Sequence, residues 1–288
     1  MPAPRPGMPP RRAWEHGTAK KPTENGFVLY ALLAFAFWLL LIVFMALGTH
    51  RLLEQFGKGR YVDWLLLPGV LVAEMAYVFG CLITGAEVRS ASLFPTGTGR
   101  AAMTQTTPRI KVAGPIMAAL IAMAGCVATI VVLHGLLGEP IIRDFIADES
   151  GLIPKVGPDL SGQLPTTAEE FWAFPGRQVQ LVRKMYETCL AANWLNWRVP
   201  LFVYLGLCLS IRLGPARRPV RPTLGAAVLG AIVLAVVQQA SAAWADRING
   251  LWLLLTYIWA SLLLVLLLVA LLRGCVYLVT VIREESQT

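Results

Sequence analysis

The chain has 288 residues, of which 56% are hydrophobic and 15% are charged. Ordinary soluble domains contain about 45–50% apolar and about 25% charged residues, so the composition argues against a soluble domain. The net charge of +8 could suit nucleic acid, but of the 25 Lys and Arg residues all except Arg198 lie outside the long apolar runs. We therefore expect no nucleic-acid partner.

Six apolar runs come close to the roughly 20 residues that a helix needs to cross the hydrocarbon core of a bilayer. They cover residues 27–48, 64–86, 112–137, 194–211, 224–244 and 251–272. Most of them lack the amphipathic period of a soluble helix. The sequence predicts an all-α polytopic membrane protein with about six transmembrane helices, and the lipid bilayer is its first expected partner.

The charges between the runs predict an orientation. The N-terminal tail carries five Lys or Arg residues, and the second and fourth loops carry four each. The third loop, residues 138–193, has eight acids against five bases. Because Lys and Arg concentrate on the cytoplasmic side, both termini are predicted to be cytoplasmic and the third loop extracytoplasmic. The expected location is a bacterial inner or plasma membrane.

Five segments follow along the chain. They are a disordered basic tail (1–26), the first three spans (27–137), the extracytoplasmic loop (138–193), the last three spans (194–272) and a cytoplasmic tail (273–288). The first tail has too few apolar groups to offset the entropy of ordering it.

Two loops carry local signals of secondary structure. Residues 88–94 alternate apolar and polar side chains, which predicts either a short strand at the membrane surface or a disordered connector. Residues 166–190 predict a helix in the third loop, because acids occupy its first turn, where the helix dipole favours them.

Small residues recur at four-residue steps along the third run, at Gly114, Ala118, Ala122 and Cys126. Such a stripe permits close helix contact in lipid. Packing within the monomer is favoured over a dimer interface. Trp252, at the start of the last run, is predicted to be an anchor at the membrane interface.

Glu74 is the only acid within any of the six runs. A charge in the middle of a span costs at least a few kcal/mol on insertion scales, so Glu74 is the first candidate for a functional residue. One interpretation is a relic of a lost activity. The other is a polar site in a cavity that still receives a substrate helix or a small ligand.

The residues after Glu74 carry a resemblance to a known family. Glu74 is followed by Gly85-Ala86-Glu87-Val88 and then by Leu93-Phe94. This order resembles the site-2-protease-like intramembrane zinc metallopeptidases. In that family a membrane helix with the motif His-Glu-x-x-His is soon followed by a Gly-x-x-Val segment and a short strand ending in Leu-Phe.

Two later segments extend the resemblance to about half of the chain. Gly114-Pro115 is similar to the Gly-Pro helix start of the family, although the asparagine often found three residues after that proline is Ala118 here. The stretch from Trp197 to Pro219 is similar to the region that leads to the family's third zinc ligand, an aspartate shortly after a proline.

In the family the two histidines bind zinc and the glutamate activates the zinc-bound water. Aligning Glu74 on that glutamate puts Ala73 and Tyr77 in the histidine positions, and no acid occurs between residues 194 and 244. The resemblance therefore implies a degenerate member with no zinc ligands, so we expect no zinc cofactor. Glu74 is left as a binding residue and no residue is assigned as catalytic.

The leading hypothesis is a pseudoenzyme that binds membrane substrates or partner proteins without cutting them. The alternative is a small membrane transporter or channel-like protein that uses the buried Glu74 in a proton or ligand path. An active enzyme with rearranged ligands, for instance zinc on His50, His134 and Glu74, ranks last. The two histidines are instead expected at the membrane interface, bonded to water.

Overall fold

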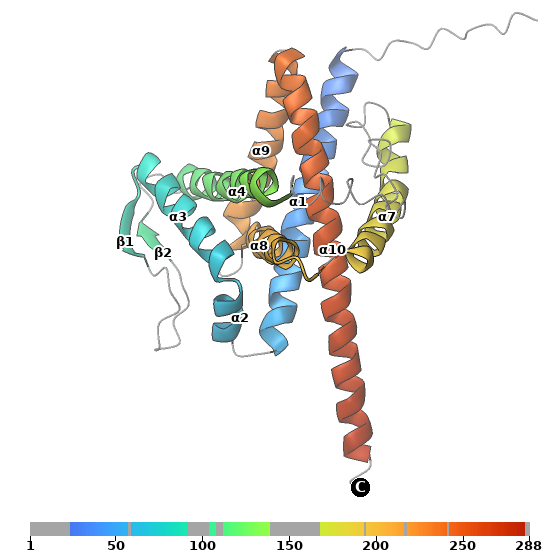
Figure 1. The fold of residues 1–288 in the computed structure, drawn as a ribbon. Coiled ribbons are helices and arrows are strands. Elements are labelled where there is room, and N and C mark those ends of the chain that lie inside the picture. The colour runs from blue at the N-terminus through green and yellow to red at the C-terminus, as the bar shows by residue number, and fades with distance from the viewer. Residues whose placement is uncertain are drawn as a thin grey trace, which may run out of the picture.

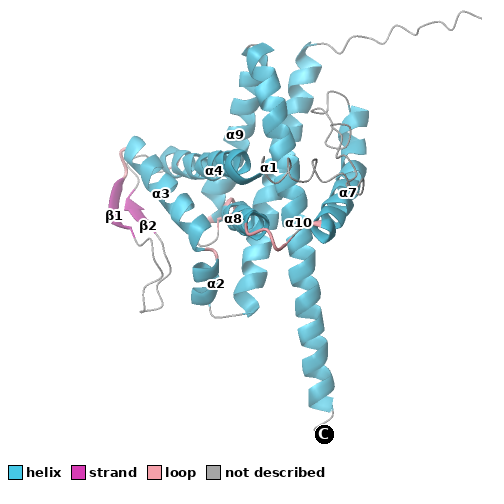
Figure 2. Cartoon of the chain, viewed as in Figure 1, coloured by secondary structure: helices cyan, strands magenta, loops and turns pink. Residues whose placement is uncertain are grey.

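A computed structural model of the chain describes residues 24–56, 59–91, 104–107, 112–138, 168–192, 194–215, 218–240 and 242–285. In these residues the chain is an assembly of helices with one small sheet (Figure 2). The predictions for residues 1–23 and for the Gly- and Pro-rich part of the third loop lie outside the described residues.

The helices follow the apolar runs, with some shortened. Their bounds are α1 Glu24–Phe56, α2 Gly59–Leu65, α3 Leu67–Ile83, α4 Ala113–Leu133, α7 Ala168–Ala191, α8 Arg198–Arg212, α9 Val220–Ala240 and α10 Ala242–Glu285. A short π-helical turn, η1 His134–Gly138, continues α4. The helix predicted at 166–190 is confirmed as α7.

Four of the described helices are long and apolar enough to cross a membrane, which supports a membrane-embedded protein. The candidate spans are Leu29–Gln55, Ala113–Gly138, Val220–Gln238 and Gly250–Val279. The predicted second and fourth spans are shorter helices instead, α3 with 17 residues and α8 with 15. At 1.5 Å per residue they rise about 25 Å and about 22 Å, less than the roughly 30 Å of a hydrocarbon core.

Both runs are shortened where the backbone breaks the helix. The second run is divided at Leu66, whose φ of −94° and ψ of 15° are not helical, and Pro68 stands in the first turn of α3. In the fourth run, residues 194–197 form turns before α8 begins. The span lengths were predicted from apolar composition alone. Composition does not indicate where the backbone leaves the helical conformation.

The first and last helices run in the same direction, side by side (Figure 1). Their contacts follow the same order along both helices. The ring centroids of Phe35 and Trp252 are 5.3 Å apart, and further along each helix Gly48 lies against Leu266. Six spans with both termini on one side would require the first and last spans to be antiparallel. The arrangement therefore departs from the predicted topology.

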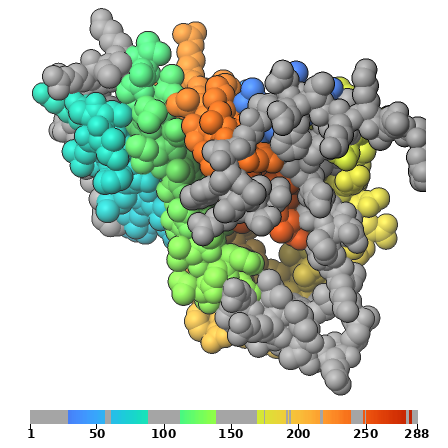
Figure 3. Space-filling view, turned by 90° about the horizontal axis from the view of Figure 1, so that it is seen from above, coloured from blue at the N-terminus to red at the C-terminus, as the bar shows by residue number. Residues whose placement is uncertain are grey.

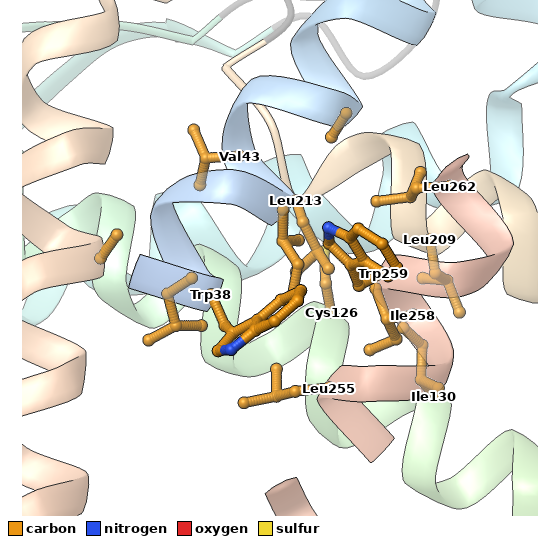
Figure 4. Close-up of a cluster of buried hydrophobic side chains, with 14 of the residues drawn as sticks. Trp38, Val43, Cys126, Ile130, Leu209, Leu213, Leu255, Ile258, Trp259 and Leu262 are labelled. Atoms are coloured by element: carbon orange, nitrogen blue, oxygen red, sulfur yellow. The ribbon is translucent and has the colours of Figure 1, made fainter. Parts of the chain in front are cut away.

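The main core lies between α1, α4, α8 and α10, as Figure 4 shows. Trp38 of α1 packs edge-on against Trp259 of α10, with ring centroids 5.0 Å apart. Trp252 is 1% exposed and meets Phe35 and Trp38. The prediction that Trp252 is an interface anchor is wrong, because its ring fills the contact between two parallel helices.

The closest helix pair is α3 with α4, and small residues make it possible. Gly114, Ala118, Ala122 and Cys126 are all buried, so the predicted stripe packs within the chain. A Cβ atom on Gly80 would lie 2.8 Å from the Cα atom of Ala118. The space-filling view shows α4 wedged between α3 and α9 (Figure 3).

A glycine-ended turn leads from α3 into the sheet. Gly85 has a φ of 68°, and the amides of Gly85 and Ala86 donate to the carbonyls of Leu82 and Cys81. This is the Schellman pattern of a helix end, which favours glycine because the left-handed conformation costs other residues more.

The sheet has two antiparallel strands, β1 Glu87–Ala91 and β2 Thr104–Thr107. Val88 pairs with Thr106 and Ser90 with Gln105, so Arg89 is an extra residue in a bulge. Of the two predictions for this loop, the strand is confirmed over 87–91, and the remainder to residue 94 lies outside the described residues. Apart from these two short strands, the regular structure of the described residues is helical, in agreement with the predicted helical fold class.

The α3–α4 contact predicts a sharp sensitivity at Gly80. Gly80→Ala should lower the melting temperature of the detergent-solubilised protein, because the new methyl group meets backbone and overpacking costs about 1–3 kcal/mol. Gly206→Ala in α8 is the matched control, because nothing lies within 4 Å of its Cβ position. Equal melting temperatures for the two variants would contradict this contact.

Candidate functional site

Glu74 lies on the packed face of α3. The buried residues of this helix include Val70, Ala73, Glu74 and Tyr77, which recur at the three- and four-residue spacing of one helical face. The neighbouring Met75 is 60% exposed. An ionisable residue in a membrane helix is expected to face protein rather than lipid, and Glu74, only 8% exposed, does so.

The segment between α8 and α9 brings Arg218 to Glu74. This segment is held close to α1 at Gly214, where a Cβ atom would lie 2.9 Å from the Cβ atom of Ala46 and from the backbone nitrogen of Leu47. The described residues resume at 218, and two residues later α9 begins at Val220. Glu74 and Arg218 are thus brought together from elements that are far apart in the sequence.

Arg218 contacts both polar side chains of the α3 face. Its Nη2 atom lies 2.6 Å from Oε2 of Glu74, with the two side chains 19% and 10% exposed. Its Cζ atom lies 3.5 Å from the centroid of the Tyr77 ring. The Glu74 contact is an ion pair by distance, although its angles do not meet those of a hydrogen bond. We call these three residues the Glu74 cluster.

A second buried ion pair joins α2 to α8. Nη2 of Arg212 donates to Oδ1 of Asp63 at 2.8 Å, and the two side chains are 9% and 3% exposed. Beside it, the hydroxyl of Tyr204 donates to the carbonyl of Leu65 at 2.6 Å. These contacts hold the end of α2, and with it the start of α3, against α8.

The residues in the histidine positions of the resemblance are both on this face. Ala73 and Tyr77 are each 8% exposed and flank Glu74 on the packed side of α3. Tyr77 stacks on Arg218 and also belongs to a small core with Cys81, Ala86, Ala118 and Ala122. Neither side chain offers a donor atom that zinc prefers.

His50 and His134, the two histidines in the described residues, form no metal-binding group with Glu74. His50 is fully buried, with its Nδ1 atom 3.8 Å from Oε1 of Glu54 on the next turn of α1. The prediction that His50 is bonded to water is wrong, because packing leaves its side chain no exposed surface. His134 is exposed in η1. Within the described ranges, no three side chains of His, Cys, Asp or Glu come together in a way that could hold a metal ion.

Sequence reasoning found Glu74 and missed its partner. Arg212 and Arg218 were both counted as cytoplasmic loop charges, whereas each is buried against an acid. The sequence did contain a signal for these partners. Asp63 directly precedes the second apolar run and Glu74 lies inside it, 11 residues later. A buried carboxylate at either position needs a basic side chain close to it in space.

The cluster has a limited chemical repertoire. Arginine is always charged in proteins, and its guanidinium stabilises a neighbouring carboxylate and stacks on aromatic rings. Glu74 is therefore paired with a cation that belongs to the chain. In this arrangement the carboxylate is a binding group for a cation.

Comparisons with known proteins do not add to this description: no family model, no curated protein and no solved structure matches the chain.

The ion pair predicts a non-additive mutational pattern. Glu74→Gln and Arg218→Met should each destabilise the protein strongly, because removing one partner of a buried pair leaves the other charge uncompensated, at a cost of about 3–5 kcal/mol. The double variant should recover most of the loss, because neither charge then remains. Thermal unfolding of the four proteins in one detergent measures the coupling.

Arg183 and Glu187 of α7 provide the matched control. They form an ion pair at 3.0 Å in which the side chains are 81% and 44% exposed. Exposed pairs contribute little, so Glu187→Gln should leave the melting temperature unchanged. Additive losses from Glu74→Gln and Arg218→Met would show that the two side chains do not depend on each other.

Proposed function

We propose that the chain is a non-catalytic relative of the site-2-protease-like intramembrane zinc metallopeptidases, and that it binds membrane substrates or partner proteins without cutting them. The observation that carries the proposal is the meeting of Glu74 with the segment after α8. The resemblance implies that these two parts of the sequence converge on one site, and Arg218 contacts Glu74.

Further features support the same proposal. The order of elements after Glu74, a glycine-ended turn and then a strand, agrees with the motif order of the resemblance. Gly114 and Pro115 lie in the first turn of α4, the helix that packs most closely on α3. In place of zinc ligands the site has Ala73, Tyr77 and an arginine. A carboxylate without a metal does not make water a strong nucleophile near neutral pH, so we propose that peptide cleavage is absent.

The transporter alternative depends on Glu74 exchanging a proton or a ligand. The contact with Arg218 argues against it, because the carboxylate of Glu74 is already occupied by a cation of the chain. A path would also require that the Arg218 side chain leave the carboxylate.

We further propose that the chain is a multi-pass protein of a bacterial inner or plasma membrane, where other membrane proteins are its partners.

A metal-binding graft tests the ancestry. The variant Ala73→His, Tyr77→His, Arg218→Asp supplies two imidazoles one helical turn apart and one carboxylate from the α8–α9 segment. If the site has the ancestral geometry, purified protein should bind about one zinc ion per chain, because three such ligands suffice for an open zinc site. Elemental analysis after gel filtration measures the stoichiometry.

The control moves the histidines to the outer face of α3. Met75→His and Phe79→His, combined with Arg218→Asp, keep the four-residue spacing, but both positions are about 60% exposed and point away from the cluster. This variant and the unaltered chain should bind far less zinc than the graft. Equal zinc in graft and control, with both proteins monodisperse, would overturn the proposed relationship.

A further inference from the structure

We propose that Glu74 and Tyr77 form a receptor for a guanidinium group, and that its resident ligand is the side chain of Arg218. The inference concerns a binding site and its ligand class, and it does not depend on descent from a metallopeptidase. It rests on two contacts made by one guanidinium, at 2.6 Å to a carboxylate oxygen and at 3.5 Å to an aromatic ring centroid.

The carboxylate supplies the charge of the receptor. Glu74 is nine-tenths buried in apolar surroundings, where the attraction between opposite charges is screened less than in water. Burying a carboxylate is costly unless a cation accompanies it. A site of this kind therefore binds a cation whenever one can reach it.

The aromatic ring supplies the selectivity. A guanidinium is planar and weakly hydrated, so it can lie against a ring face while it contacts a carboxylate. An ammonium is compact and strongly hydrated. At 3.5 Å, Arg218 lies far closer to Tyr77 than the half-buried Arg198 does to Trp197, where the corresponding distance is 5.8 Å. The receptor should therefore prefer guanidinium compounds over ammonium compounds.

Arg218 occupies the receptor because its attachment to the chain favours it. The close approach of Gly69 in α3 to the backbone of Cys208 in α8 keeps the following segment within reach of α3, so the side chain binds at a high effective concentration. A free guanidinium compound cannot compete with it in the unaltered protein. Removing the Arg218 side chain should expose the same site to a ligand in solution.

The experiment measures rescue by a free cation. Arg218→Ala, in the full chain in detergent, is melted in 20 mM guanidinium chloride and in 20 mM sodium chloride. Guanidinium should raise the melting temperature by roughly 3 °C if it binds in the low millimolar range, because a ligand that binds only the folded state stabilises it. Ammonium chloride at 20 mM should raise it less, because the ammonium ion is compact and strongly hydrated.

Two further proteins locate the effect. The unaltered chain should show no shift with guanidinium, because Arg218 occupies the site. Arg218→Ala with Glu74→Gln should show none, because the carboxylate is gone. Equal guanidinium shifts in Arg218→Ala and in Arg218→Ala with Glu74→Gln, or no shift in either, would overturn the proposal.

A second measurement covers the case in which Arg218→Ala is not recovered as folded protein. Expression of this variant in membranes is followed by extraction in buffer with or without 20 mM guanidinium chloride. The guanidinium arm should yield at least twofold more monodisperse protein than a sodium chloride arm. Equal yields in the two arms would contradict a guanidinium receptor at Glu74 and Tyr77.

Discussion

Much of this structure depends on one requirement, which is that the buried carboxylate of Glu74 needs a cation beside it. Glu74 lies in an apolar helix with 8% of its surface exposed, and a charge in such a place is tolerated only with a partner. Because α3 contains no basic residue, the partner must come from elsewhere in the chain. Arg218 fulfils this requirement, and so ties the segment between α8 and α9 to α3.

Close contacts between helices make this meeting possible. Gly69 approaches the backbone of Cys208, Gly80 approaches Ala118, and Gly214 approaches α1 at Ala46. In lipid, helices gain little from hydrophobic burial against each other, so tight van der Waals contact between small residues contributes more. The glycines therefore stabilise the same elements that carry the two ion pairs, and charge compensation and close packing depend on each other.

The sequence was enough to predict four of the candidate membrane spans, the small-residue stripe on α4 and helix α7, and it singled out Glu74, whose side chain is buried. Each of these is a local property of composition or period. It was not enough to predict that Leu66 interrupts the second run, that Trp252 is buried, or that Arg218 reaches Glu74. Those features depend on which helices become neighbours, and apolar residues at buried and lipid-facing positions look alike in a sequence.

The paired arginines show why a charge count is an incomplete guide to topology. The positive-inside rule treats each Lys or Arg in a loop as a charge at the cytoplasmic surface. Arg212 and Arg218 are also paired with Asp63 and Glu74, so the charges of two of the four bases of that loop are compensated within the protein. The parallel course of α1 and α10 is independent of any charge count (Figure 1). Because helix direction follows from packed side chains, it is the stronger constraint on how the spans are threaded through the bilayer.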